Sequence, residues 1–410
     1  MKKIFRILSH ISLRINSGAE GVFLFCLLLP LLGNKCDSGV LFQEITTELA
    51  APIAVAVDTD NLRAYVVNSN NNAEFTGTTF SVLDITDPAA PVLLNNPANP
   101  IPAPNYSAQI YLDTTNGFAY MPNRASDDAV DTSDSLLRIN VDETSASFGT
   151  IETFNNGENP FGIACCDASG RIYVVDGGGT GTGTIAVFDP AEPVQPADLS
   201  TYVQISLEVV LASGDRITGR DSTEVVLLGS QAFVTNRNGN LYVINTTEVG
   251  DTSKNPIDTV VLNSEDLRGI ATDGTLLYVV DGKSDTLLLR IINPALLAPV
   301  DPDVATVSEV DIAAVQTATV SLGTDRTTDP NEVAVFNGKA YVTNRGLDTV
   351  SVIDLATNTL ETTIAVGDQP YGMTAFTVGA TNYLYVANLV SNSISIIDPA
   401  TNTVVNAFSP

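Results

Sequence analysis

Carboxylates are the side chains of this chain best suited to chemistry. The single histidine, His10, lies in an apolar N-terminal segment, and the chain has no tryptophan. If export removes that segment, a Ser-His-Asp triad and histidine-bound zinc, copper or haem are excluded. Carboxylate, Ser-Lys or Ca²⁺ chemistry remains. We therefore look for reactive or binding groups among the 47 acidic residues.

The densest group of acids lies in the segment SDDAVDTSD, residues 126–134, which carries Asp127, Asp128, Asp131 and Asp134. Closely spaced carboxylate oxygens are suitable ligands for Ca²⁺. The spacing does not match an EF-hand loop, however, and no glycine stands at its turn. A Ca²⁺ site and a solvated acidic loop both remain open, and no other cofactor is expected.

The cysteines are sparse, and two of them are adjacent. Cys165 and Cys166 lie in FGIACCDASG, which has the composition of a strand. Neighbouring strand residues point to opposite faces of a sheet, and a bridge between them needs a distorted peptide. The sequence therefore predicts two small buried thiols rather than a disulfide.

The N-terminus resembles an export signal. Basic residues, among them Lys2, Lys3 and Arg6, precede the apolar run GVFLFCLLLPLLG, which is shorter than the ~20 residues of a membrane span. We predict a signal peptide over residues 1–36 and a location in the periplasm or at the cell surface. Cys36 stands where bacterial lipoproteins are acylated, although Asn34 and Lys35 replace the small residues expected before it. Acylation, with anchoring to the outer membrane, and ordinary cleavage both remain open.

The charge of the chain restricts its partners. Acids outnumber Lys and Arg 47 to 19, and the formal net charge is −28. Affinity for nucleic acid comes largely from basic side chains on phosphates, so DNA and RNA are excluded as partners. Anionic membranes are disfavoured too, apart from a lipid anchor. Cations, sugars and basic proteins remain, and the charge itself also suits a saline habitat.

A tetrapeptide recurs seven times with an aromatic residue first and Asn or Asp last. The aromatic residues are Tyr65, Tyr120, Tyr173, Phe233, Tyr278, Tyr341 and Tyr385. Strand-like segments precede and follow each copy, and the mean spacing is about 53 residues. Four strands per unit, repeated radially, predict an all-β, seven-bladed β-propeller with four antiparallel strands per blade over residues 41–410. A β-solenoid is the structural alternative.

Unit six, KAYVTNRGLDTVSVIDLATNTLETTIAVGDQPYGM (339–373), resembles the consensus of the YVTN family of bacterial exported propellers. Unit seven is similar, and the earlier units are looser. The resemblance implies a cell-envelope propeller related to surface-layer and lactonase-like proteins. It is specific for fold and weak for function, because propellers host many activities.

Counting back from each aromatic residue aligns one position at the mouth of strand one in every unit. This ring reads Ala54, Gln109, Gly162, Glu224, Gly269, Glu332 and Gly372. The preceding residues include Phe161, Arg268, Asn331 and Tyr371. We predict a ligand site at the channel mouth, in which two glutamates beside an arginine could hold a cation or a small polar molecule. Its residues are Gln109, Phe161, Glu224, Arg268, Asn331, Glu332 and Tyr371. A water-filled channel with compensated charge is the alternative.

These observations predict a monomeric binding or scaffold module with no catalytic residue assigned. It would recognise a protein, a glycan or a small polar ligand on the face that carries the long loops between strands two and three and between blades. The family resemblance implies an alternative, a lactonase-like hydrolase that depends on carboxylates or Ca²⁺. An electron carrier is disfavoured, because the chain has no CxxCH motif.

Overall fold

The computed structural model divides the chain into two units, residues 1–47 and 48–410. It describes residues 49–69, 78–103, 109–124, 135–155, 159–178, 181–190, 202–211, 214–251, 255–282, 286–297 and 307–409, all of which belong to the second unit. The predicted signal segment with Cys36 and the four predicted Ca²⁺ ligands Asp127, Asp128, Asp131 and Asp134 lie outside these residues.

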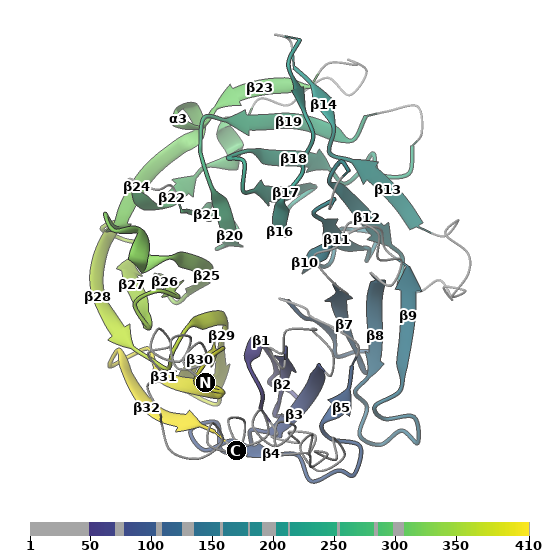
Figure 1. Cartoon of the computed structure of the whole chain (residues 1–410), viewed down its shortest axis with the longest axis vertical. Helices are drawn as coiled ribbons and strands as arrows, with labels where there is room; N and C mark the ends of the chain where they lie inside the picture. Colours follow the sequence, from purple (N-terminus) through teal and green to yellow (C-terminus); the bar gives the residue numbers. More distant parts are fainter. Residues whose placement is uncertain are drawn as a thin grey trace, which may run out of the picture. The chain divides into compact units, whose positions relative to one another are not determined.

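Seven antiparallel sheets of four strands follow one another along the chain and form a ring, so the predicted propeller is confirmed and the solenoid is excluded (Figure 1). Blades 1 to 3 consist of β1 (Pro52–Asp58), β2 (Arg63–Asn68), β3 (Thr79–Asp84) and β4 (Val92–Leu93); β6 (Tyr111–Asp113), β7 (Phe118–Asn123), β8 (Ser135–Asn140) and β9 (Ile151–Asn155); and β10 (Pro160–Ala164), β11 (Ile172–Asp176), β12 (Thr184–Phe188) and β13 (Tyr202–Ser206).

Blades 4 to 7 continue the same order. They consist of β16 (Ser222–Leu228), β17 (Gln231–Asn236), β18 (Leu241–Asn245) and β19 (Ile257–Leu262); β20 (Leu267–Thr272), β21 (Leu277–Asp281), β22 (Leu287–Ile292) and β24 (Gln316–Gly323); β25 (Pro330–Phe336), β26 (Lys339–Asn344), β27 (Thr349–Asp354) and β28 (Thr359–Ala365); and β29 (Pro370–Val378), β30 (Thr381–Asn388), β31 (Ser393–Asp398) and β32 (Thr403–Phe408).

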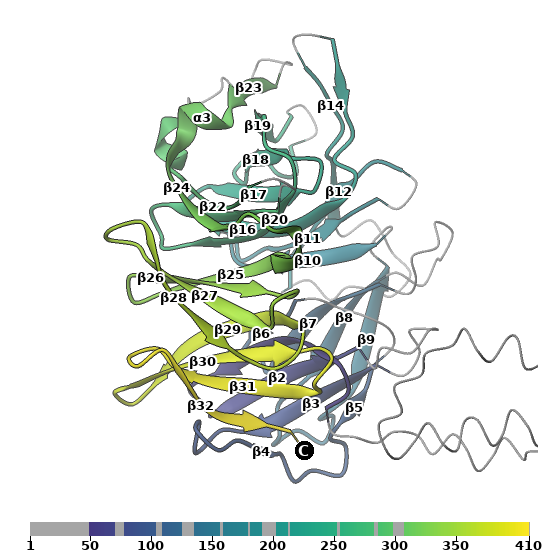
Figure 2. The ribbon, with the colours of Figure 1, turned by 60° about the vertical axis from the view of Figure 1, so that its left-hand side comes forward.

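The remaining elements lie at the edges of the blades. β5 (Ile101–Pro102) pairs with β3, and β23 (Ser308–Asp311) adds a parallel strand to the outer edge of blade 4. β14 (Val209–Val210) and β15 (Arg216–Ile217) form a separate hairpin, and α3 (Ile312–Val315) joins β23 to β24. Figure 2 shows the blades from the side, with α3 and β14 at the same end of the view.

The Asn that ends five of the seven tetrapeptides has a structural reason. Asn68, Asn344 and Asn388 end the second strand of their blades, and their side-chain amides donate to a serine hydroxyl of the third strand at 2.8, 2.9 and 2.9 Å. Each amide thereby fixes the register of two strands at one end of the blade. An Asn at this position is therefore required by the fold, not by a ligand.

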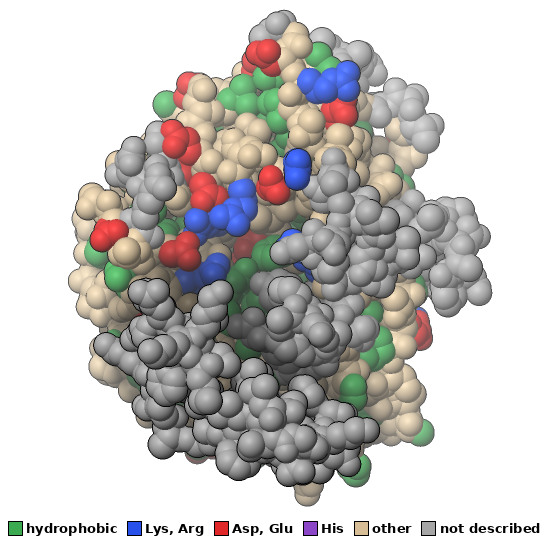
Figure 3. Space-filling model, in the orientation of Figure 1, with side chains coloured by type: hydrophobic (Ala, Val, Ile, Leu, Met, Phe, Trp, Pro, Cys, Tyr) green, Lys and Arg blue, Asp and Glu red, His purple; other side chains and the backbone are tan. Residues whose placement is uncertain are grey.

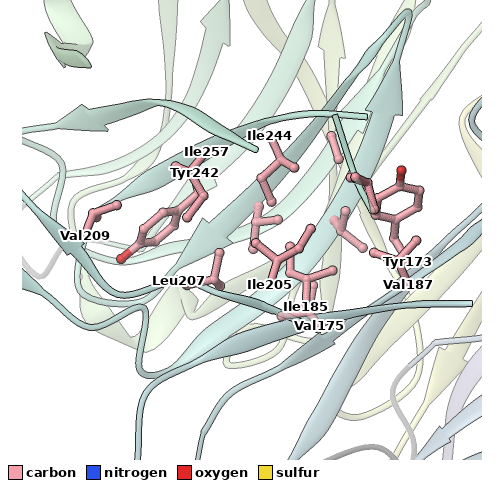
Figure 4. Close-up of a cluster of buried hydrophobic side chains, with 14 of the residues drawn as sticks. Tyr173, Val175, Ile185, Val187, Ile205, Leu207, Val209, Tyr242, Ile244 and Ile257 are labelled. Carbon is pink, nitrogen blue, oxygen red and sulfur yellow. The ribbon is translucent and has the colours of Figure 1, made fainter. Parts of the chain in front are cut away.

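The core lies between the blades, because each sheet is covered on both faces by its neighbours. All seven aromatic residues of the tetrapeptides are buried, with exposed fractions of at most 3%. Figure 4 shows one such contact, where Tyr173, Ile185 and Ile205 of blade 3 belong to the same apolar cluster as Tyr242 and Ile244 of blade 4. Burial of these apolar side chains drives the stacking of blades around the ring.

The ring closes without a strand shared between the two ends of the chain. Blade 7 takes all four strands from the C-terminal segment, and its outermost strand is β32, which contains TVVNAF. The contact of blade 7 with blade 1, here called the seam, is held by a buried apolar cluster from both blades and by individual hydrogen bonds. Asn392 Oδ1 accepts from the Ala51 N–H at 2.7 Å, and the buried Tyr385 hydroxyl donates to the Pro88 carbonyl oxygen at 2.5 Å.

The prediction for the adjacent cysteines was wrong. Cys165 and Cys166 form a disulfide across a cis peptide, and Cys166 is exposed. The prediction assumed that both residues continue a strand. β10 ends at Ala164, however, so strand alternation does not apply to them.

Candidate functional site

In six of the seven blades, the predicted ring position lies in or directly beside a bulge of the first strand. In β25, the register shifts between Pro330 and Val333, and the same shift occurs in β1, β10, β16, β20 and β29. A bulge bends a strand and redirects its side chains. Pro330 pairs with Asn344, so strand one begins beside the loop that follows strand two. We call this face of the ring the mouth face.

Large and small residues alternate around the ring at this position. Blades 2, 4 and 6 carry Gln109, Glu224 and Glu332, and the other blades carry Ala54, Gly162, Gly269 and Gly372. A Cβ atom on Gly162 would lie 2.5 Å from the Thr223 carbonyl oxygen, and one on Gly269 would lie 2.6 Å from that of Asn331. These two glycines therefore let the next blade approach closely, and long side chains from the flanking blades meet over them.

Gln109, Glu224 and Glu332 form a row of hydrogen bonds inside the channel. Gln109 Oε1 accepts from the Ile163 N–H of the next blade at 2.9 Å, and Glu224 Oε2 accepts from the Ile270 N–H of its next blade at 3.0 Å. Glu224 also forms hydrogen bonds with the side chains of Gln109 and Glu332. Glu332 Oε1 accepts from the adjacent Val333 N–H at 3.3 Å. We call these three residues the polar row.

The two carboxyl groups hold a proton between them. Burial raises the pKa of Glu224 to about 7, although the hydrogen bonds from Glu332, Ile270 and Gln109 lower it. The pKa of Glu332 is raised well above its usual range by burial, by the negative charge of Glu224 and by the hydrogen bond to it. Two carboxylates in contact in a buried site do not both ionise readily. The hydrogen bond between them raises the pKa of Glu332 and lowers that of Glu224, so Glu332 is the donor.

Two threonines outside the predicted set of site residues fix the bulges under the glutamates. The Thr235 hydroxyl accepts from the Glu224 N–H at 3.2 Å and donates to the Arg268 carbonyl oxygen at 2.6 Å. The Thr343 hydroxyl accepts from the Glu332 N–H and donates to the Tyr371 carbonyl oxygen, both at 3.0 Å. The sequence held a signal for them, because only FVTN and YVTN carry threonine at the third tetrapeptide position.

Arg268 does not pair with the glutamates. Its Nε and Nη2 donate to Asp266 Oδ2 at 3.0 and 2.8 Å, and its Nη1 donates to Asp329 Oδ1 at 2.6 Å and to the Pro330 carbonyl oxygen at 2.7 Å. The predicted grouping of two glutamates with this arginine is therefore wrong. The aspartates that begin neighbouring blades hold the guanidinium at the mouth, away from the polar row.

The other predicted ligand residues lie around the row with different roles. Phe161 packs against the apolar cluster of blades 1 and 2, and Tyr371, which is 7% exposed, belongs to that cluster. The Arg345 guanidinium lies 4.9 Å from the centre of the Tyr371 ring. Asn331 is half-buried in the bulge beside Glu332. Phe161 and Tyr371 are therefore wall residues, and the polar chemistry belongs to the row.

Three arginines repeat at the mouth in the same alternate blades. Arg124, Arg237 and Arg345 directly follow the tetrapeptides of blades 2, 4 and 6. Arg237 Nε lies 3.2 Å from Asp266 Oδ1, and Arg345 Nε lies 3.7 Å from Asp329 Oδ2. Figure 3 shows acidic and basic side chains beside one another in the region of β20 and β25. Basic charge at this part of the mouth is thus compensated by aspartates.

A cavity of about 250 Å³ opens beside the polar row. Gln109 and Glu332 supply polar wall, and Ala54, Val55 and Met373 supply apolar wall. A second cavity of about 320 Å³ lies at the other ends of β1 and β8, where Asp58, Arg63 and Glu143 line it. It shares no residue with the predicted site.

Neither a metal centre nor a membrane span is found in the described parts of the chain. No group of three or more Asp, Glu, His or Cys residues among them could hold a metal ion. No helix in those same segments is long and apolar enough to cross a membrane.

The fold defines the chain as a seven-bladed β-propeller, and known propellers share it. Kuenenia stuttgartiensis hydrazine synthase matches with a TM-score of 0.59 and 14% identity, over 90% of this chain and 99% of that chain. The β-propeller domain of Myceliophteria thermophila Cps50 (Swd1) matches with a TM-score of 0.54 and 10% identity, over 85% and 96%. Saccharomyces cerevisiae Sqt1 matches with a TM-score of 0.53 and 9% identity, over 86% and 97%.

At these identities the similarity shows the fold alone. No protein-family model matches the chain, and no curated protein matches its sequence.

Proposed function

We propose that this chain is an exported binding propeller of the YVTN-repeat kind, which captures a ligand at its channel mouth through the polar row. The row is the observation that carries the proposal. Glu224 is only 4% exposed, and a carboxyl group is costly to bury. If packing were the only requirement at this position, Ala or Gly would be sufficient, as in blades 1, 3, 5 and 7. A polar row retained at the centre of a binding scaffold is best explained by recognition.

Binding is favoured over catalysis by how the carboxyl groups are used. Glu224 accepts a backbone N–H and bonds to two side chains, so its oxygens are committed. A general base needs a lone pair directed at its substrate. The ligand would be a small polar molecule, or the polar end of a protein or glycan held by the loops of the mouth face.

A lactonase-like hydrolase is the second candidate, because one observation favours it. Two carboxyl groups that share a proton, one with a pKa of about 7, are an arrangement that acid–base enzymes use. Glu332 would act as the acid and Glu224 as the base. Lactone hydrolysis by the wild-type protein that disappears in the Glu224→Gln, Glu332→Gln double variant would establish this candidate in place of pure binding.

Export is part of the proposal. The basic start and the apolar run of residues 21–33 support a signal peptide, and Cys36 supports acylation. The intact mass of the protein recovered from cells shows whether the signal peptide is cleaved and whether Cys36 is acylated. A mass increased by acyl chains on Cys36 places the protein at a membrane surface, and cleavage without added mass places it free in the periplasm or outside. An uncleaved chain contradicts export.

The binding test compares three proteins on the same arrays of peptides, glycans and small polar molecules. These are the wild type, the Glu224→Gln, Glu332→Gln double variant, and Glu361→Gln, which removes a carboxylate from the outer strand β28. We expect a ligand that the wild type and Glu361→Gln retain and the double variant loses. Ligands that the double variant binds equally well would place recognition outside the channel and overturn the proposal.

A further inference from the structure

Because the ring has seven blades, an odd number, large and small residues cannot alternate all the way around it. Blades 2, 4 and 6 carry the long residues, so each small position from blade 3 to blade 5 has a long one on either side. Blades 7 and 1 are neighbours, however, and both are small, with Gly372 and Ala54. No long side chain covers the seam from either of them. The cavity of about 250 Å³ lies in the channel beside this place, where both residues line it together with residues of blades 2, 3, 4 and 6.

Glu332 departs from the pattern of the other two members of the polar row. Gln109 and Glu224 each accept the N–H of the residue that follows the small position of the next blade, Ile163 and Ile270. The equivalent residue for Glu332 is Met373. Glu332 instead accepts from Val333, bonds to Glu224 and lines the cavity. Its carboxyl group therefore stands at a cavity wall and is held by another carboxyl group through a proton.

Apolar side chains form part of the remaining cavity wall, beside Thr374. Val55, Ile163, Val225 and Met373 line it, and Gln109 and Glu332 stand on the polar side. A ligand that suits this cavity has a short apolar body and one polar head. The head must satisfy the carboxyl pair, and the body must cover the apolar wall.

The head is best a primary ammonium. An anion would be repelled by the carboxyl pair and by a chain of net charge −28, whereas a cation is attracted. A metal ion would need more ligands, and no metal-binding group occurs in the described segments. An ammonium carries three N–H donors and no acceptor, so it can replace the shared proton between two carboxylates. Arg268 and Arg345 at the mouth are paired with Asp266 and Asp329, so their charge is compensated.

We propose that the seam cavity binds a short alkylammonium group, with its head on Glu332, the member of the carboxyl pair that lines the cavity, and its chain against Val55, Val225 and Met373. The group could be a free amine or the end of a lysine side chain. The inference rests on the proposed channel site and names the class of its ligand. Binding replaces the proton of the carboxyl pair, which leaves to solvent.

Calorimetry of the mature protein with butylammonium, methylammonium and 1-butanol tests this inference. We expect butylammonium to bind at least about tenfold more tightly than the neutral 1-butanol. Each methylene lost from the chain should weaken binding by about fourfold, the factor for full burial of one CH₂ group. Affinity should rise with pH as long as the amine stays charged, because binding releases the shared proton to solvent. The charged groups nearest to the pair are Arg268 and Arg345 at the mouth, and both are paired there with Asp266 or Asp329.

Separate variants test the contacts of the ammonium head and those of the alkyl chain. Glu332→Gln should weaken butylammonium binding by at least about tenfold, and Glu361→Gln should leave it unchanged. Ala54→Leu fills the cavity, so it should weaken butylammonium more than methylammonium. Ala54→Val should do the same to a smaller extent and serves if the leucine variant melts early.

Three outcomes would overturn the inference while leaving the proposed function intact. Equal affinity for 1-butanol and butylammonium would show that the head is not an ammonium. Butylammonium binding that is unaffected by both Ala54 variants would place the amine outside the seam cavity. Absence of butylammonium binding, with an array ligand that still depends on the polar row, would overturn it as well. Failure of every array ligand to depend on the row would instead reject the proposed function.

Discussion

Glu224 and Glu332 share a hydrogen bond across Gly269, a residue of the blade that separates theirs. The contact exists because blade 5 contributes no side chain at this position and because the Glu332 backbone packs directly against the glycine. A buried carboxyl pair of this kind makes the free energy of unfolding depend on pH.

The Glu224→Gln, Glu332→Gln double variant should gain stability relative to the wild type as the pH rises. Glu224 has a pKa of about 7 in the folded protein against the usual 4.5, so the folded state holds its proton longer than the unfolded chain does. The corresponding stability is fully present below about pH 4.5 and is lost as the pH rises through 7. The loss amounts to about 3 kcal/mol. Urea unfolding of both proteins between about pH 5 and pH 8 measures it.

Glu361→Gln is the control for this series, because its carboxylate lies exposed on β28. Its free energy of unfolding should follow that of the wild type across the pH range. A constant difference between the double variant and the wild type at every pH would show that the pair does not share a proton in solution.

Gly269→Ala should destabilise the protein more than a glycine replacement in open space. The new Cβ would lie 2.6 Å from the Asn331 carbonyl oxygen and 2.9 Å from Glu332 Cα, so blade 6 must move. We expect a loss of about 2–3 kcal/mol, as for overpacking of a core. Gly229→Ala, with φ +62° and no neighbour within 4 Å, should cost about 1 kcal/mol through its backbone alone. Equal losses in urea unfolding would contradict the close contact.

Thr343→Val should lower the free energy of unfolding by about 1–3 kcal/mol. Valine is the residue that blades 1, 3 and 5 carry at this position, so its size and strand propensity suit the site. The loss therefore reports the two hydrogen bonds of the Thr343 hydroxyl, to the Glu332 N–H and the Tyr371 carbonyl oxygen. Thr363→Val, on the exposed face of β28, should change stability by less than about 0.5 kcal/mol. A Thr343→Val effect no larger than this would show that the bulge needs no support.

The repeat could be predicted from the sequence because it depends on local chemistry. An aromatic residue three positions before an Asn marks the buried second strand, and the amide of that Asn bonds to the third strand in the same blade. Counting back from this aromatic residue then located the equivalent position in the first strand of each blade. Counting in this way assigned Gln109, Glu224 and Glu332 to equivalent positions of their blades, and their role as a ligand site stays a prediction.

The contacts of these residues could not be predicted, because contacts between blades join distant segments. Arg268 was grouped with the glutamates by its offset alone, and the aspartates that bind it stand at the starts of two different blades. The Cys165–Cys166 disulfide depends on where β10 ends, and composition does not set such an end to within a residue. With an odd number of blades, two small residues must be neighbours somewhere in the ring. Their place at the seam becomes visible only when blade 7 is known to pack against blade 1.

Blades 7 and 1 meet at the seam without a shared strand among the described residues, and Tyr385→Phe tests how much one hydrogen bond contributes there. The variant removes a buried hydroxyl that donates to the Pro88 carbonyl oxygen across the seam. We expect a loss of about 1–2 kcal/mol, because the carbonyl is left without that donor. Asn392→Gly removes the acceptor of the Ala51 N–H in the same contact. It preserves the left-handed backbone of residue 392, φ +49°, which glycine adopts without strain.

Hydrogen exchange locates the effect of both seam variants. β29 packs against β1 at the seam, so amides of these strands should exchange faster than in the wild type. Amides of β20 and β25, which pack against each other elsewhere in the ring, serve as the internal control and should keep their protection. If protection falls uniformly around the ring, the propeller opens as one cooperative unit and the seam has no separate stability. Opening confined to β1 and β29 would instead give the seam cavity its own route for a ligand, since these two strands carry Ala54 and Gly372.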